Sequence, residues 1–281
     1  MKRFEKIVIV TDIDGTFISD KEALVERNLA AIEYFKAHGG RFTVASGRAA
    51  EHIRGSIPCV DELVNIPAVT CNGANLYDYD REETVASYPM DIGLVREVVD
   101  FVRKKYPRAG VRASAEGYCF VSTPEDMKNP LVDGDFKRYN TTNHFINPIE
   151  EWEELDVYKV VVRIDEADIL DAMDMLREHF GDRVSVTQSW ATIIDVQRGG
   201  INKGATLERY ARQSYGEDVR IYACGDYLND LEMLKCVDVA VCPSNAHPEI
   251  KKISRLCLCS NNEGLIADLV DHIEKEIKNE I

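Results

Sequence analysis

The sequence predicts an α/β fold, a doubly wound parallel sheet with an inserted α+β unit, and three observations support this. Apolar strand-like runs alternate with amphipathic helical segments in residues 1–78 and again in residues 196–281. Residues 79–195 show a mixed pattern instead, with helices and antiparallel-type strands. Polar turns follow directly on several strands of the two outer segments. We therefore expect one domain from residues 1–78 and 196–281, and a second from residues 79–195.

The first segment opens with an apolar run over residues 6–12, which indicates a strand buried on both faces. Apolar residues at helical spacing predict a helix over 22–37, which ends before two glycines. Further strands are expected over 41–48 and 67–74, with a short helix over 49–56 between them. This order is typical of a sheet whose strands run parallel.

The last segment repeats this rhythm. It predicts helices over 202–216, 228–237 and 264–280, and strands over 219–226, 238–245 and 255–260. The insert predicts helices over 91–107 and 167–181, and strands over 117–123, 156–165, 183–189 and 191–197. The apolar stripe of the last helix could serve a dimer contact, but it suits packing on the sheet better. The stripe therefore does not decide between a monomer and a homodimer.

Composition excludes several classes of function. The formal net charge is −15 and the pI is near 4.9, without a basic run, so we expect no nucleic-acid partner. No apolar stretch is long enough to cross a bilayer and no signal segment is evident, so we expect no membrane association and a cytoplasmic location. The 8 cysteines form no C-x-x-C pair, and we expect them to be reduced.

Four polar turns end strands of the outer segments. They are Asp12-Ile13-Asp14-Gly15-Thr16, Ser46-Gly47-Arg48, Asn72-Gly73 and Gly225-Asp226. Each turn alone is a weak signal. In open parallel sheets, however, ligands bind beyond the carboxyl ends of the strands, so all four turns should face one crevice. Arg48, Asn72 and Gly73 thereby become candidates for substrate binding.

The crevice should gather carboxylates. Asp12, Asp14 and Asp226 would raise one another's pKa unless a cation lies between them, and Mg²⁺ is the ordinary cation for an all-oxygen site. Asp230, one helical turn beyond Asp226, can reach the same metal or its waters, or it can be a charge favoured at a helix N-terminus. Asn229 lies at the same helix start and is a helix cap or a site residue.

Phosphate-binding groups accompany the carboxylates. Ser46 offers a hydroxyl, and Gly47 lets backbone N–H groups approach an anion. Lys203 begins a predicted helix, where an ammonium can neutralise a phosphate and a carboxylate together. The sequence therefore predicts a site for a small phosphorylated molecule.

With these motifs, the chain resembles the haloacid dehalogenase (HAD) superfamily, specifically the Cof-like (class IIB) phosphatases. The resemblance covers the whole chain and includes the motifs D-x-D-G-T, S-G-R, N-G, G-x-N-K-G and G-D-x-x-N-D in order. Ile13 and Phe17 replace the family's usual leucines, which changes nothing chemical. The resemblance implies a HAD-like Rossmannoid core and a cap that selects the substrate.

The resemblance also implies a mechanism. Asp12 would be the nucleophile that forms an aspartyl-phosphate, and Asp14 would protonate the leaving alcohol and then activate water. Mg²⁺ would be held by Asp12, Asp226 and the Asp14 backbone carbonyl, with Asp230 nearby. Ser46 and Lys203 would bind phosphoryl oxygens. Asn229 would help to hold the phosphate or the lysine ammonium.

Two alternatives keep the same fold. A mutase or phosphotransferase of the phosphomannomutase type would pass the phosphoryl group to a sugar hydroxyl instead of water. A non-catalytic phosphosugar-binding protein should have lost Asp12 or Asp14, and both are present. Sugar phosphates are the favoured substrates, with nucleotide or cofactor phosphates open. Residues 133–145 either line the substrate or form an ordinary loop.

Overall fold

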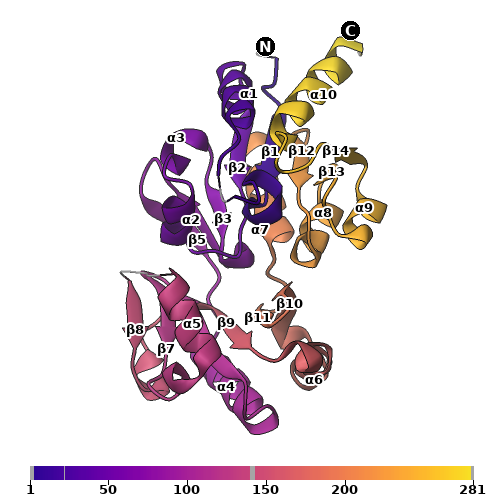
Figure 1. Cartoon of the computed structure of the whole chain (residues 1–281). Coiled ribbons are helices and arrows are strands. Elements are labelled where there is room, and N and C mark those ends of the chain that lie inside the picture. The colour runs from indigo at the N-terminus through magenta and orange to yellow at the C-terminus, as the bar shows by residue number, and fades with distance from the viewer. Residues whose placement is uncertain (1–2, 22, 140–142, 280–281) are drawn as a thin grey trace.

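The computed structural model describes residues 3–21, 23–139 and 143–279, and Figure 1 shows them as two bodies joined by a narrow waist. The upper body holds helices α1 (Glu26–Ala37) and α10 (Leu265–Asn279), which lie side by side although they are far apart in the sequence. The lower body is formed by the middle of the chain. The predicted α/β fold with an inserted α+β unit is confirmed.

The upper body, which we call the core, is built on a parallel sheet. Its strand order is β14 (Leu256–Leu258), β13 (Val239–Pro243), β12 (Arg220–Cys224), β1 (Ile7–Thr11) and β2 (Arg41–Val44). All five residues of the central strand β1 are buried. Successive side chains of a strand point to opposite faces, and in β1 Ile9 packs in one apolar cluster while Val10 packs in another. The continuous apolar run of β1 is therefore explained by helices on both faces.

The helices of the core divide between these two faces. One face is covered by α1, α10, α2 (Ala50–Ser56) and α3 (Val60–Leu63), and the other by α7 (Lys203–Tyr215), α8 (Leu231–Cys236) and α9 (Pro248–Ile253). The helix predicted over 22–37 begins at Glu26. The helix predicted over 228–237 begins at Leu231, after a single turn over Leu228–Asp230. The other predicted core helices agree with the structure to within about one residue at each end.

A small antiparallel sheet flanks β2. It consists of β3 (Ala68–Thr70), β4 (Asn75–Asp78) and β5 (Glu83–Ser87). A parallel bridge between Ala45 and Val69 ties it to the main sheet, so β3 continues the parallel order, as the sequence predicted. The β4–β5 hairpin was not predicted, and the expected domain boundary between residues 78 and 79 falls inside it.

The lower body, which we call the cap, has one six-stranded sheet. Its order is β10 (Val184–Trp190), β11 (Ile193–Arg198), β9 (Val157–Arg163), β6 (Gly110–Ala115), β7 (Tyr118–Ser122) and β8 (His144–Ile146). The pairings are antiparallel except that β7 and β8 run parallel. Helices α4 (Ile92–Lys105) and α6 (Ile169–Phe180) pack on the sheet, and α5 (Pro130–Tyr139) contacts β6.

The sequence predicted four of the cap strands and two of its helices, but not β6, β8 or α5. The expected boundary between residues 195 and 196 falls inside β11, which belongs to the cap sheet. Among the described residues no helix is both long and apolar enough to span a membrane. All eight cysteines are free, as predicted.

Candidate active site

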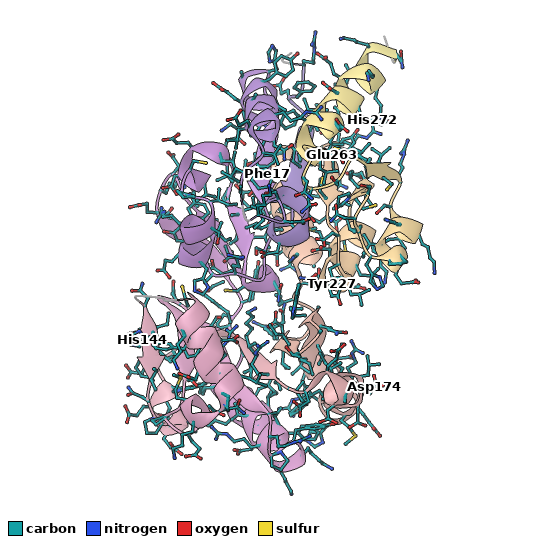
Figure 2. The ribbon with its side chains drawn as sticks, viewed as in Figure 1. Phe17, His144, Asp174, Tyr227, Glu263 and His272 are labelled. Atoms are coloured by element: carbon teal, nitrogen blue, oxygen red, sulfur yellow. The ribbon has the colours of Figure 1, made fainter. Side chains whose placement is uncertain are left out.

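A cleft of about 960 Å³ lies between the core and the cap. On the core side it is lined, among others, by Asp12, Asp14, Ser46, Gly47, Arg48, Asp226 and Asn229. Figure 2 labels Tyr227, also a lining residue, at the lower edge of the core, where it faces the cap. The polar turns after β1, β2 and β12 therefore meet at one crevice, where parallel-sheet geometry predicts them.

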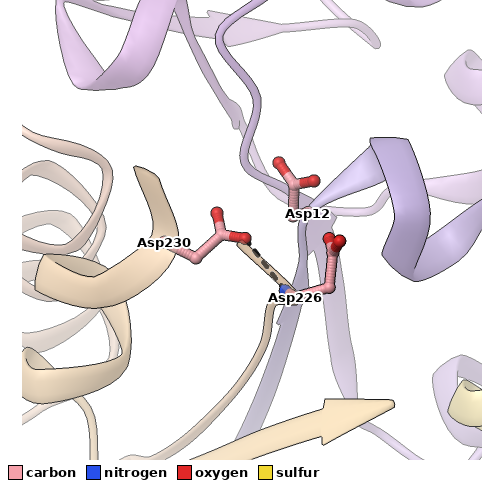
Figure 3. Close-up of side chains that lie close together, drawn as sticks. All are labelled: Asp12, Asp226 and Asp230. Carbon is pink, nitrogen blue, oxygen red and sulfur yellow. Dashed lines mark hydrogen bonds between the residues drawn. The ribbon is translucent and has the colours of Figure 1, made fainter. Parts of the chain in front are cut away.

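Three carboxylates cluster on the core side of the cleft, where Asp12 and Asp226 line it and Asp230 is fully buried; with Lys203 we call this cluster the core floor. Asp12, Asp226 and Asp230 each offer an oxygen, and these oxygens lie within 4.8 Å of one another (Figure 3). Burial, together with the neighbouring carboxylates of Asp230 and Asp226, raises the pKa of Asp12 well above its ordinary value. Burial and Asp230 likewise raise the pKa of Asp226 to about 7. Such a cluster favours protons or a cation between its members.

Lys203 supplies one positive charge to this floor. Its side chain is almost fully buried, and Nζ lies 2.5 Å from Asp12 Oδ1 and 2.8 Å from Asp230 Oδ1. Burial alone would lower the pKa of Lys203, but Asp12 and Asp230 raise it, so the ammonium stays charged. Asn202 caps the helix by accepting the N–H of Ala205, which fixes where α7 and Lys203 begin.

Asp230 uses both of its oxygens. Oδ1 accepts from Lys203, and Oδ2 accepts the backbone N–H groups of Asp226 (3.0 Å, dashed in Figure 3) and Tyr227 (3.3 Å). It therefore holds together the turn that carries Asp226 and the lysine. Asp230 was predicted to be a neighbour of the metal or a charge at a helix N-terminus, and its contact with Lys203 was not predicted.

Gly15 lets the β1 turn close onto Asp226. Its φ is +77°, and a Cβ built there would lie 2.5 Å from Asp226 Oδ2. The next residue, Thr16, donates its hydroxyl to Asp226 Oδ1 at 2.7 Å. The D-x-D-G-T turn thus positions a carboxylate that follows a different strand.

Asp14 differs from Asp12 in its surroundings. The side chain of Asp12 is 7% exposed, while that of Asp14 is 53% exposed. Arg48 binds both Asp14 oxygens, with Nε to Oδ2 at 2.9 Å and Nη2 to Oδ1 at 2.6 Å. Asp14 therefore stands farther out in the cleft, paired with a guanidinium instead of the other carboxylates. Arg48 was predicted as a substrate-binding residue, and its pairing with Asp14 was not.

The turns after β2 and β3 are joined to each other. Ser46 accepts the N–H of Asn72 with its backbone oxygen at 2.9 Å, and its hydroxyl accepts the N–H of Arg48 at 3.2 Å. A Cβ on Gly47 would lie 2.9 Å from Asn72 Oδ1. Asn72 has a φ of 56° and donates to Asp195 of the cap at 2.7 Å. Asn72 thus links the core turn to the cap.

Gly73 lies behind the cleft wall. A Cβ there would lie 2.3 Å from the backbone oxygen of Asn202, and Thr206 donates its hydroxyl to the Gly73 oxygen at 2.8 Å. Neither Asn72 nor Gly73 lines the cleft. The N-G motif therefore packs against the start of α7, where Lys203 stands.

The cap side of the cleft carries five charged residues, of which only Asp135 lies in a stretch, 133–145, that was considered as a substrate lining. They are Arg112, Asp135, Lys159, Arg163 and Asp195. A signal was present in β9, where Lys159 and Arg163 stand four residues apart in an otherwise apolar run and so share one face of the strand. Within the stretch 133–145, Asp135 and Asn143 line the cleft, while residues 140–142 lie outside the described residues.

The fold and the site define an α/β enzyme with an acidic floor beneath a cap. The model of the haloacid dehalogenase-like hydrolase family matches residues 9–270. The chain therefore belongs to this family, and it is a Cof-type phosphatase within it, as the resemblance of its motifs indicated. Phosphatases of the family generally use a divalent metal.

Known relatives match over almost their whole length. The chain is 22% identical to pyridoxal phosphate phosphatase YbhA of Escherichia coli strain K12 (94% of this chain, 97% of the relative). It is 25% identical to 5-amino-6-(5-phospho-D-ribitylamino)uracil phosphatase YitU of Bacillus subtilis strain 168 (92% and 94%). A solved structure of a HAD subclass IIB sugar phosphatase superposes with a TM-score of 0.79 at 19% identity (96% and 99%), which shows the shared fold.

Proposed function

We propose that the protein hydrolyses phosphomonoesters of small metabolites, with sugar phosphates favoured, through an aspartyl-phosphate on Asp12. The observation that carries this proposal is the buried contact of Lys203 with Asp12, beside Asp226, at the carboxyl ends of the parallel strands. A nucleophilic carboxylate, a phosphate-neutralising ammonium and a metal-competent pair of carboxylates are thereby available in one cleft.

The donor set fits a divalent cation. Asp12 and Asp226 are oxygen ligands whose pKa values are raised by burial and by neighbouring carboxylates, so a cation between them would relieve that repulsion. We propose that these two carboxylates and the Asp14 backbone carbonyl hold Mg²⁺. The metal, when bound, would offset the repulsion between the Asp12 carboxylate and the substrate phosphate. Asp230 would position Lys203 and the Asp226 turn.

Residues of the cleft would bind the phosphate and transfer the protons of the reaction. Asp12 would attack phosphorus while the Lys203 ammonium and the Ser46 hydroxyl bind phosphoryl oxygens, with Gly47 leaving room for the anion. Asp14, farther out, would give a proton to the leaving alcohol and later take one from the attacking water. Because Arg48 binds both Asp14 oxygens, a bound substrate would have to separate this pair. Asn229, which lines the cleft, would contact the phosphate.

The cap would select the substrate. Relatives named for pyridoxal phosphate and for a ribitylaminouracil phosphate show that members of this family accept different small phosphate esters. We place the division between core and cap near residues 88 and 199, which keeps the β4–β5 hairpin in the core and all of β11 in the cap.

The test is a hydrolysis screen over a panel of phosphomonoesters with Mg²⁺, followed by product analysis. We expect inorganic phosphate to be released, and release to stop when a chelator is added. Transfer of the phosphoryl group to a second sugar, seen by phosphorus NMR, would favour a phosphotransferase instead. Full turnover in metal-free buffer would contradict the proposed site.

A further inference from the structure

The cap sheet has two faces of opposite character. In β9, Val160 and Val162 pack in the apolar core of the cap with Val111 of β6. Lys159 and Arg163, at alternate positions, share the other face of β9, and both line the cleft. The sheet has therefore already buried one apolar face, and it presents its second face to the substrate cleft.

This second face carries a cluster that we call the cap wall: Arg112, Lys159, Arg163, Asp135 and Asp195. Lys159 Nζ lies 2.9 Å from Asp195 Oδ2. Arg112 Nε and Arg163 Nε lie 2.9 Å and 3.2 Å from the same atom, Asp135 Oδ2. These five side chains are at most 14% exposed. The cap wall thus sets three cations against two carboxylates.

Such a cluster is costly to bury. Ion pairs in a protein interior seldom stabilise the fold more than apolar side chains of the same size would. Asp195 accepts from Lys159, Ser189 and Asn72 through one oxygen, and its other oxygen has no hydrogen-bond partner within the described structure. A wall with this cost, facing a cleft, is explained if it receives a ligand.

The positive field of the cap wall reaches across the cleft. His52, on α2 of the core, also lines the cleft. Burial, together with the positive charges of Arg112, Arg48 and Lys159, lowers the pKa of His52 to about 4. The histidine is therefore neutral at pH 7. Glu51, the neighbouring carboxylate, accepts from Cys119 and Asn143 of the cap.

We propose that the cap wall binds an acidic group of the substrate, so that the preferred substrates are phosphomonoesters with a carboxylate or second phosphate at the end remote from the transferred phosphate. This inference rests on the proposed function. A cleft of about 960 Å³ has room for a metabolite that reaches from the core floor to the cap. Guanidinium groups recognise carboxylate and phosphate oxygens by paired hydrogen bonds, which suits Arg112 and Arg163 to this task.

The test compares two pairs of substrates that differ in one terminal group. These are 6-phosphogluconate with sorbitol 6-phosphate, and 3-phosphoglycerate with glycerol 3-phosphate. We expect the acidic member of at least one pair to have a kcat/KM about tenfold higher or more, in line with a charge-assisted hydrogen bond. p-Nitrophenyl phosphate, which lacks a remote acidic group, reports the phosphatase reaction separately.

Two variants locate the preference. Because Arg112 and Arg163 share Asp135, Arg112→Gln or Arg163→Gln leaves that carboxylate paired with the other arginine. We expect either change to lower kcat/KM for the acidic member about tenfold more than for its neutral partner. Arg183→Gln, on the exposed surface of the cap beside Glu97, is the matched control and should change neither value.

The outcomes separate the two proposals. Equal or better turnover of both neutral members, or an equal loss on both members in the arginine variants, would overturn the acidic-group inference while the proposed hydrolysis stands. If no phosphomonoester, including p-nitrophenyl phosphate, were hydrolysed, the proposed function would fail, and this inference with it.

Discussion

The core floor and the cap wall are both buried clusters of charge, but their imbalances are opposite. In the core, the ammonium of Lys203 contacts Asp12 and Asp230, and Asp226 lies beside these two carboxylates, so carboxylates are in excess. In the cap wall, three cations face two carboxylates. A buried excess of charge is tolerated where a ligand of the other sign completes it. The core floor therefore suits a metal cation, and the cap wall suits an anionic group.

The largest effect should come from Asp12, because the proposed chemistry has no other nucleophile. Asp12→Asn should lower kcat by at least ~10³-fold for every substrate, whatever its remote group. Steady-state assays over neutral and acidic esters measure this. Asp174→Asn, at an exposed carboxylate of the cap, should be inert. Near-normal turnover by Asp12→Asn would show that Asp12 is not the nucleophile.

Asp14 should matter less, and its effect should depend on the leaving group. Asp14→Asn removes the proposed acid and base, which is typically worth ~10²–10⁴ in rate. p-Nitrophenyl phosphate has a good leaving group, so the first step should be partly rescued while the second step stays slow. Pre-steady-state kinetics should then show a burst of nitrophenol. An equal loss with both kinds of leaving group would argue against this role.

The stability of the metal-free protein should report the carboxylate excess. The folded-state pKa of Asp226, about 7, lies above its ordinary 3.8. Between these values Asp226 therefore binds more protons in the folded protein than in the unfolded chain, and its contribution to the free energy of unfolding falls as pH rises from about 4 to about 7. Urea unfolding in chelator should show this decline as a pH-dependent difference in the free energy of unfolding between the wild type and Asp226→Asn.

The same unfolding experiment is repeated with two variants and with added Mg²⁺. Asp226→Asn should lose this contribution, whereas Asp174→Asn should keep the pH profile of the wild type. Mg²⁺ should restore stability at pH 7, since it binds the folded state and replaces the protons. Parallel pH profiles for the wild type and Asp226→Asn in chelator would contradict the raised pKa of Asp226.

The smallest predicted effect concerns the turn that places Asp226. Gly15→Ala puts a Cβ 2.5 Å from Asp226 Oδ2 at a φ of +77°, which should cost about 1–3 kcal/mol and weaken Mg²⁺ binding. Gly55→Ala, in helix α2 with no atom within 4 Å of the added Cβ, is the control and should be neutral or slightly stabilising. Equal results for the two variants in thermal unfolding would contradict the close packing of the turn.

The two clusters differ in how far the sequence could predict them. The core floor was predictable because parallel strands end at one edge, so polar turns after β1, β2 and β12 must meet. The contacts between its side chains were not predictable. Asp230 and Lys203 are 27 residues apart in sequence and Arg48 and Asp14 are 34 apart, so these contacts depend on side-chain directions that the sequence does not give.

The cap wall escaped prediction for a different reason. Its members come from β6, β9, β11 and α5, of which β6 and α5 were not predicted. The register of the strands decides which residues share a face of the sheet. Val161 of β9 lies opposite Arg112 on one neighbouring strand and opposite Asp195 on the other, so these two side chains are on the same face. A slip of one residue would turn every such side chain to the other face. The sequence showed that Lys159 and Arg163 alternate with valines. It did not indicate which face of the strand would be turned toward the cleft.

The most direct test of the account is to trap the phosphoenzyme. Wild-type protein and the Asp12→Asn and Asp14→Asn variants would be mixed with phosphate-labelled p-nitrophenyl phosphate and Mg²⁺, acid-quenched within milliseconds, and digested for mass spectrometry. We predict label on the peptide that contains Asp12, more of it in Asp14→Asn than in the wild type, and none in Asp12→Asn. Label retained in Asp12→Asn, or found on a different residue, would contradict the assignment of Asp12 as the nucleophile.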